Sequence, residues 1–186
     1  QAILTYLYDE AQGIFVKMLN IADDGTMVYD HTLDMSSVYG VFAFGVLPVD
    51  DPRLVGAIKH VENRLVCKTG VSGVVRYEGD RYYRSVEDVP GNPWFITTLW
   101  LAQYYIERAK KESDFGEVHK WLAWTTKYAT SSGVLSEQIH PHTGAQLSAA
   151  PLTWSHSEYV ATIVKYLNRL EELGICLKCN PLYTGE

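Results

Sequence analysis

The chain has few cysteines, no long apolar run and no excess of positive charge. Only three of its 186 residues are cysteine, Cys67, Cys176 and Cys179. So low and odd a count argues against a disulfide framework and points to a reducing compartment such as the cytoplasm. No apolar run reaches the roughly 18 residues of a membrane helix. The formal charge of −6 predicts neither nucleic acid nor an anionic membrane as a partner.

Several chemical signatures are also missing. There is no Gly-rich phosphate loop, and no serine lies in a Gly-x-Ser-x-Gly pattern. The Cys176-x-x-Cys179 pair is half a metal site, a redox pair or two incidental thiols, and the second pair that a zinc site needs is absent. His140-x-His142 has no nearby acid except Glu137, which favours two exposed histidines over a metal site. We therefore expect neither a metal nor a cofactor.

The sequence does show helical spacing of apolar residues along most of its length. Apolar residues make up 47% of the chain, and their period of about 3.6 predicts helices over 54–65, 95–109, 118–129 and 160–170. Two weaker candidates lie around 2–11 and 34–46. Capping residues are predicted before four helices: Asp51 with Pro52, Asn92 with Pro93, Asp114 with Glu117, and Thr153.

The connections between these helices alternate in length. Residues 12–33, 69–92 and 132–152 are long, whereas 47–51 and 111–114 are short. The first long connection predicts a β-hairpin with strands over 14–19 and 27–30 and a turn at 23–25. Helices joined by short turns run antiparallel, so all three long connections should lie at one end of the helices. We expect an all-α fold of six helices in an arc of antiparallel hairpins, with its functional face at that end.

The connection over 69–92 contains residues that suit a sugar ligand. Arg76, Asp80 and Trp94 lie there or directly after it, among several tyrosines. Charged side chains can match sugar hydroxyls in pairs, and an indole or phenol ring packs on the apolar face of a pyranose. The alternative is a solvated loop whose aromatic residues pack on the helices below.

The connection over 132–152 contains a single acidic residue, Glu137. A lone carboxylate among apolar and hydroxyl residues, at the mouth of a helical stack, is a candidate general base. The alternative is an ordinary surface glutamate.

Two motifs in these connections resemble glycoside hydrolase family 15, the glucoamylases and their relatives. One reads Arg76-Tyr-Glu-Gly-Asp80-x-Tyr-Tyr…Asn92-Pro-Trp94-Phe, and the other reads Ser136-Glu137-Gln138…Gly144…Leu147-Ser148-Ala…Pro151-Leu-Thr-Trp154-Ser. They occur in the order that the family has. The resemblance covers about residues 34–164 and implies a fold related to an (α/α)6 toroid of twelve helices.

The resemblance also implies roles for individual residues. Glu137 would be the general base that activates water, with Ser148 beside it. The terminal glucose would be held through its hydroxyls by Arg76 and Asp80, in a pocket lined by Trp94 and Trp154. The implied ligand is an oligo- or polysaccharide with a terminal α-glucose, cleaved with inversion.

This chain corresponds to only six of the twelve helices, so it would be the C-terminal part, residues 1–186, of one glucoamylase-like domain. The N-terminal half of the barrel, which carries the family's general acid, has no counterpart here and would be a partner. The chain alone is therefore expected to be inactive. Glu78 is the other acid to consider, and the resemblance gives it no role. Alternatives are a trehalase, a glucodextranase, a non-catalytic glucan-binding or regulatory domain, and a helical-repeat scaffold, which the absence of any sequence period disfavours.

Overall fold

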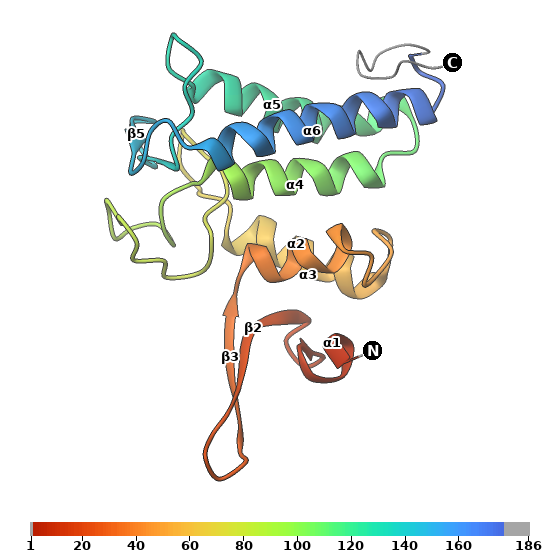
Figure 1. Cartoon of the computed structure of the whole chain (residues 1–186), viewed down its shortest axis with the longest axis vertical. Coiled ribbons are helices and arrows are strands. Elements are labelled where there is room, and N and C mark those ends of the chain that lie inside the picture. The colour runs from red at the N-terminus through yellow and green to blue at the C-terminus, as the bar shows by residue number, and fades with distance from the viewer. Residues whose placement is uncertain (1, 177–186) are drawn as a thin grey trace.

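The computed structural model describes residues 2–176. Its helices and strands, coloured along the chain in Figure 1, are α1 (Ala2–Tyr6), β1 (Tyr8–Asp9), β2 (Ile14–Ile21), β3 (Met27–Leu33), α2 (Met35–Ala43), α3 (Pro52–Arg64), α4 (Phe95–Arg108), the 3-10 helix η1 (Glu112–Phe115), α5 (Gly116–Tyr128), β4 (Gln138–Ile139), β5 (Gln146–Leu147) and α6 (Thr153–Glu172). The six predicted helices are all present within this part of the chain, together with small antiparallel sheets.

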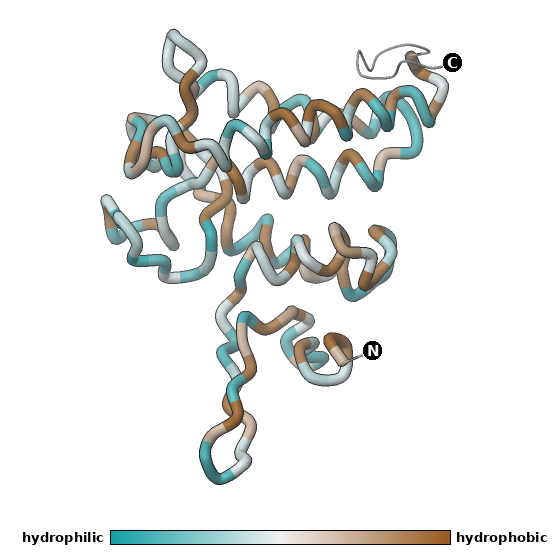
Figure 2. The backbone as a smooth tube through the Cα atoms, in the orientation of Figure 1, coloured by the Kyte–Doolittle hydropathy of each residue, from teal (hydrophilic) through white to brown (hydrophobic). Residues whose placement is uncertain are grey.

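Helix α4 lies at the centre of the helical body, between α2 and the α5–α6 pair (Figure 1). Eleven of its 14 residues are buried, because helices pack on more than one of its sides. The surrounding helices are amphipathic instead, and apolar segments recur along each of them in Figure 2. Burial of this apolar surface is the main stabilising contribution to the fold. Cys67 belongs to the same core, although it lies after the end of α3 and not on a helix.

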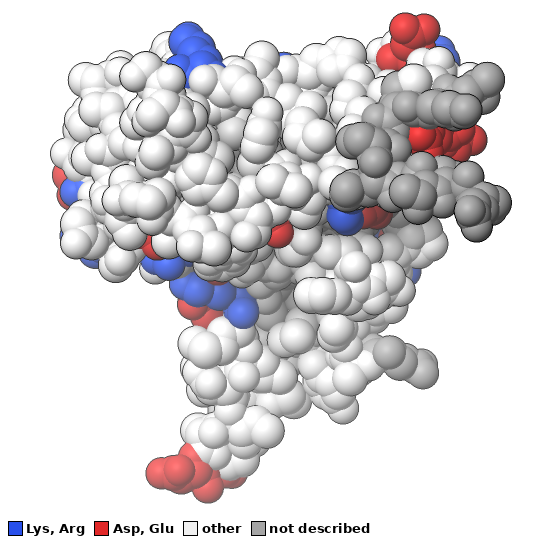
Figure 3. Space-filling model, turned by 45° about the horizontal axis from the view of Figure 1, so that its top comes forward, with Lys and Arg blue, Asp and Glu red and all other residues white. Residues whose placement is uncertain are grey.

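The predicted hairpin is confirmed, and its strands are longer than the apolar pattern indicated. Strands β2 and β3 pair antiparallel from Val16 opposite Leu33 to Ile21 opposite Met27, with one irregularity. Gly25 adopts a φ of 83° in the turn, as the sequence predicted. The hairpin projects from the helical body (Figure 1), and acidic side chains gather at its tip (Figure 3).

The first helix is shorter than predicted. Only Ala2–Tyr6 is helical, and Tyr8–Asp9 pairs with β2 instead. The carboxylate of Asp9 accepts hydrogen bonds from the backbone N–H groups of Ala11 and Gln12. This side-chain turn competes with the helix, as aspartate commonly does.

The capping predictions were correct at one position and wrong at three. Asp51 caps α3 by accepting from the N–H of Arg53 at 2.9 Å. The residues at the N-caps of α4, α5 and α6 are Trp94, Phe115 and Leu152, none of which makes a side-chain capping bond. Each predicted cap lies one or two positions away. The side chain of Asn92 is directed into loop contacts, that of Asp114 accepts from the N–H of Lys110, and Thr153 is already helical.

The long connections lie together at one end of the helices, which confirms the prediction from their alternating lengths. Isolated backbone bridges join Asp34 to Tyr77, Val75 to Pro93 and Trp94 to Gln138. The bridges thus link the residue after the hairpin to the second connection, and the second connection to the third at the start of α4. Among the described residues, no helix is both long enough and apolar enough to cross a bilayer.

Candidate active site

Arg76 and Asp80 form a bidentate ion pair in the connection between α3 and α4. Nε of Arg76 lies 3.0 Å from Oδ2 of Asp80, and its second terminal nitrogen lies 2.9 Å from Oδ1. The Asp80 residue is only 1% exposed. Burial alone lowers the pKa of Arg76, but the hydrogen bonds and the charge of Asp80 raise that pKa above its ordinary value. The guanidinium is therefore charged, and its two hydrogen bonds hold the pair in one geometry.

Aromatic rings surround the guanidinium of Arg76. Its central carbon lies 4.6 Å from the ring centroid of Trp94, 4.8 Å from that of Tyr77 and 5.4 Å from that of Tyr82. Trp94 is 3% exposed and supports the guanidinium from the protein side, whereas Tyr82 is 46% exposed. Cation–π contacts of this kind fix the orientation of the guanidinium plane. Asp80 and Trp94 are therefore part of the core, whereas residues 81–83 of the same connection are exposed to solvent.

Glu137 lies in the connection between α5 and α6, directly before strand β4. The hydroxyl of Ser148 donates a hydrogen bond to Oε2 of Glu137. The two residues meet because β4 and β5 pair Gln138 with Leu147, which places the residues next to each of them side by side. The backbone N–H of Glu137 donates to the carbonyl of Ala149 at 2.9 Å. The carboxylate is half-buried, and it is oriented by the strand pair.

The two connections meet at the start of α4. The backbone of Trp94 bridges to that of Gln138, and the N–H of Ile139 donates to the carbonyl of Pro93 at 3.0 Å. Arg76 packs on the Trp94 ring, and Glu137 is the neighbour of Gln138. The structure therefore brings Arg76, Asp80, Trp94, Glu137 and Ser148 into one contiguous region.

Trp154 reaches the same region from the first turn of α6. It is 52% exposed and lies edge-on to Trp100, with ring centroids 5.9 Å apart. Its neighbour Ser155 donates a hydrogen bond to the carbonyl of Ser136 at 2.8 Å. The start of α6 is thereby tied to the segment that carries Glu137.

The remaining candidates have other partners. Glu78 accepts both hydrogen bonds of the Arg64 fork, at 2.7 and 2.6 Å, so it is engaged in a structural ion pair. His142 pairs with Asp88 at 2.9 Å. Across residues 2–176, no cluster of three metal-binding side chains occurs. The Cys176–Cys179 pair extends beyond the described residues.

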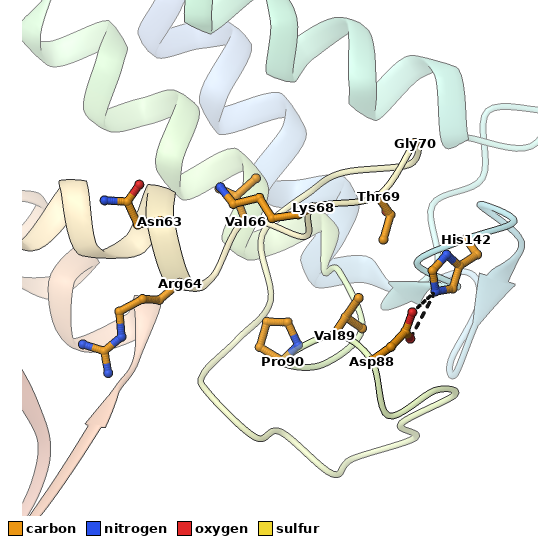
Figure 4. A pocket seen from close by; sticks show the side chains of 10 residues that line it. All are labelled: Asn63, Arg64, Val66, Lys68, Thr69, Gly70, Asp88, Val89, Pro90 and His142. Atoms are coloured by element: carbon orange, nitrogen blue, oxygen red, sulfur yellow. Dashed lines mark hydrogen bonds and ion pairs between the residues drawn. The ribbon is translucent and has the colours of Figure 1, made fainter.

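The Asp88–His142 pair lies at a separate pocket of about 410 Å³ between α3 and the two connections (Figure 4). Its polar lining comprises Asn63, Arg64, Lys68 and Thr69 besides this pair. None of the residues predicted to bind sugar lines it, so it is distinct from the site around Glu137.

Three residues of this region were not predicted to belong to the sugar site. Tyr82 and Asn92 lie within the first motif, and Gln138 lies within the second. Asn92 was interpreted as a helix cap, but it is 2% exposed and donates to the side chain of Gln138. The signal in the sequence was an asparagine before Pro93. It was interpreted as the cap of α4, whereas its amide bonds to Gln138.

The geometry gives the site a definite chemical capability. A half-buried carboxylate held by a hydroxyl and a strand pair is suited to accept a proton from water. The Arg76–Asp80 pair presents directed donors and acceptors for hydroxyl groups. Tyr82 and Trp154 offer exposed rings for the apolar face of a sugar.

Known proteins share the sequence pattern and the fold of this chain. The family profile "Glycosyl hydrolases family 15" matches residues 1–164. An uncharacterized glycosyl hydrolase of Methanocaldococcus jannaschii is 34% identical over 164 residues, which are 83% of this chain and 24% of that protein. A glucoamylase of a Clostridium species is 25% identical over 157 residues, 76% of this chain and 20% of that protein. The chain thus spans a quarter or less of the curated relatives it matches.

Solved structures show the same fold. A bacterial glucoamylase complexed with acarbose matches with a TM-score of 0.67 at 23% identity, over 84% of this chain and 25% of that one. A glycosidase variant in complex with glucose matches with a TM-score of 0.64 at 23% identity, over 94% of this chain and 42% of that one. The family match over residues 1–164 and the shared fold establish that this chain belongs to glycoside hydrolase family 15.

Proposed function

We propose that this chain is part of an inverting, exo-acting α-glucosidase that releases glucose from the non-reducing ends of α-glucans. The observation that carries the proposal is the contiguity of the site. The backbone of Trp94 bridges to that of Gln138, the residue after Glu137, and the ring of Trp94 contacts the guanidinium of Arg76. Structures of the same fold are complexed with acarbose and with glucose.

In this proposal Glu137 is the general base. Ser148 holds one carboxylate oxygen, which leaves the other to accept a proton from a water that attacks the anomeric carbon. Arg76 and Asp80 hold hydroxyls of the terminal glucose, and Trp154 packs on the sugar. In an inverting enzyme the general acid lies about 6.5–9.5 Å from the base, which leaves room for that water.

The general acid is proposed to lie outside these 186 residues, in the other half of the same barrel. Glu78, the other acid considered, is engaged by Arg64, and the chain covers only 20–24% of its curated relatives. The purified 186-residue chain should therefore release no glucose from maltose or starch above the buffer blank. Glucose release in a coupled oxidase assay would overturn the assignment of the acid.

The base is tested by Glu137→Gln in the whole protein. Removing a general base costs about 10²–10⁴ in rate, so kcat on maltose should fall by at least two orders of magnitude. Binding of acarbose, measured by calorimetry, should persist. The control is Glu87→Gln, a carboxylate of the other connection that is largely exposed, and its kinetics should be unchanged. Unaltered activity of Glu137→Gln would rule out the base.

The same assays decide between the alternatives. A wild-type protein that binds acarbose but cleaves no α-glucoside would be a non-catalytic glucan-binding domain. Comparison of kcat/KM for maltose, isomaltose and trehalose would distinguish a glucoamylase from a glucodextranase or a trehalase. We expect maltose and longer α-1,4-glucans to be preferred.

A further inference from the structure

The side chain of Asn92 uses its full hydrogen-bonding capacity inside the protein. Its oxygen accepts from the backbone N–H of Ser85 at 3.2 Å and from the Ser85 hydroxyl at 2.8 Å. Its nitrogen donates to the carbonyl of Tyr83 and to Oε1 of Gln138, both at 2.7 Å. Asn92 is 2% exposed. One buried amide therefore joins two connections that are 46 residues apart in sequence at Gln138.

On one side, Asn92 holds the segment that orders the sugar-binding pair. Tyr83 has a φ of 54°, an unfavourable conformation for a tyrosine that needs support from its surroundings. The hydrogen bond from Asn92 to its carbonyl supplies that support. The preceding N–H, that of Tyr82, donates to Oδ1 of Asp80 at 3.0 Å. Asn92 thus fixes the segment whose backbone orients Asp80.

On the other side, Asn92 holds the residue that follows the proposed base. Gln138 is fully buried, and the nitrogen of its side chain has no hydrogen-bond partner among the described residues. A buried amide whose nitrogen leaves both of its N–H donors unpaired is less favourable than an apolar side chain of the same volume. The stability of the core therefore does not explain a glutamine at position 138. The hydrogen bond that its side-chain oxygen accepts from Asn92 explains it.

We propose that Asn92 and Gln138 are positioning residues that set the distance between Glu137 and the Arg76–Asp80 pair. The inference rests on the proposed function, because it assigns these residues to the same site. Neither side chain touches the reacting atoms. The Asp88–His142 pair and the Thr69 hydroxyl also join these two connections, but the bond between Asn92 and Gln138 is the one that lies next to the base in sequence and holds it in register with the sugar-binding pair. A displacement of about 1 Å between such groups can reduce the rate of a reaction by up to about a hundredfold.

The decisive substitution is Gln138→Met, which keeps the volume of the side chain and removes the acceptor for Asn92. The Arg76–Asp80 pair and the bonds of Asn92 to Ser85 and Tyr83 remain. We expect kcat of the whole protein on maltose to fall by about tenfold or more, with KM within about twofold. The unfolding temperature should stay close to that of wild type, because methionine removes the unpaired nitrogen of Gln138 and leaves one N–H of Asn92 without an acceptor. The acidic limb of the pH–rate profile should not move, because the base itself is intact.

Two matched variants separate the two sides of the link. Ser85→Ala removes one bond on the sugar side and leaves the bond to Gln138, so its kcat should stay near the wild-type value. Asn92→Ala releases both sides, so its KM should rise while its kcat falls. A Gln138→Met variant with unchanged kcat would overturn the proposal, and so would a rise in KM alone.

Hydrogen exchange separates failure of this inference from failure of the proposed function. In Gln138→Met, backbone amides of both 82–85 and 136–139 should exchange faster, whether or not the protein cleaves α-glucosides. Faster exchange in 136–139 alone would show that the two connections are not coupled, and would overturn the positioning role. A wild-type protein without hydrolytic activity, but with the coupled exchange, would refute only the glycosidase assignment.

Discussion

Ser148 donates a hydrogen bond to the Glu137 carboxylate from a left-handed backbone conformation, with a φ of 64°. Few residues other than glycine adopt this conformation without a cost of about 1–2 kcal/mol. A favourable interaction of the Ser148 side chain must therefore compensate for the backbone strain. The structure shows one such interaction, the hydrogen bond that orients the proposed base.

Two substitutions separate the hydroxyl of Ser148 from its backbone. Ser148→Ala and Ser148→Gly both remove the hydrogen bond, and both should lower kcat on maltose to a similar extent. Ser148→Gly also relieves the strain, so its free energy of unfolding should exceed that of Ser148→Ala by about 1 kcal/mol. Urea denaturation of both variants measures the difference. Wild-type kcat in either variant would contradict the role of the hydroxyl.

Replacement of Arg76 should affect both stability and binding. In Arg76→Ala the 1% exposed Asp80 loses its bidentate partner. The free energy of unfolding should fall by about 1–3 kcal/mol. This decrease is smaller than for a fully buried pair because the Arg76 side chain is itself 32% exposed. Arg76→Lys keeps the charge but loses the fork, and should recover only part of the stability. Urea denaturation and calorimetric titration with acarbose measure the two effects, and a lysine variant equal to wild type in both would contradict the geometry.

Gly73 and Gly79 form a matched pair for the packing of the first connection. A Cβ atom at Gly73 would lie 2.4 Å from the Trp124 ring and 2.8 Å from Pro93, whereas one at Gly79 would meet nothing within 4 Å. Both positions have a positive φ. Gly79→Ala should lower the free energy of unfolding by about 1 kcal/mol, because only the backbone is strained. Gly73→Ala should lower it by about 3 kcal/mol or more, because the new methyl group also clashes with Trp124 and Pro93. If thermal denaturation shows equal decreases in stability for the two variants, the close packing of Gly73 on Trp124 and Pro93 is wrong.

The ion pair between Asp88 and His142 should make stability depend on pH. The hydrogen bond from His142 lowers the pKa of Asp88 below its usual value. A depressed carboxyl pKa contributes stability that is present above the unfolded pKa, about 3.9, and is lost as the pH falls through the folded value. Asp88→Asn should therefore destabilise the protein at pH 6, and the difference from wild type should vanish towards pH 2. A difference that persists at pH 2 would argue against this linkage.

The sequence was most informative where a pattern repeats over many residues. The apolar period located α3, α4, α5 and α6, and the alternation of connection lengths predicted which end of the helices carries the site. Individual capping residues were less predictable. Asn92 beside Pro93 has the composition of a helix start, yet its amide is used by Tyr83, Ser85 and Gln138. Local preference was overridden by contacts between residues that are distant in sequence, and a single sequence does not report those contacts.

The candidate site residues also divide into those that the sequence indicated and those that only contacts between distant segments reveal. The motifs identified Arg76, Asp80 and Glu137 because their side-chain chemistry is specific. Tyr82 and Gln138 lay within the quoted motifs without a role, because their importance depends on the ring that stacks on Arg76 and on the acceptor that Asn92 needs. Trp94 was expected to line a sugar pocket; the structure shows it buried, with its ring against the guanidinium of Arg76.

The backbone bridges between successive connections have a consequence for protein engineering. Residues 34, 77, 75, 93, 94 and 138 are joined in pairs from one connection to the next, so the segments around the site resemble the strands of a small, irregular sheet. Transplanting one connection from a homologue would leave its neighbour with unmatched backbone groups. Chimeras of this family should tolerate exchange of 69–94 and 132–152 as a single set, and should fold poorly when either segment is exchanged alone.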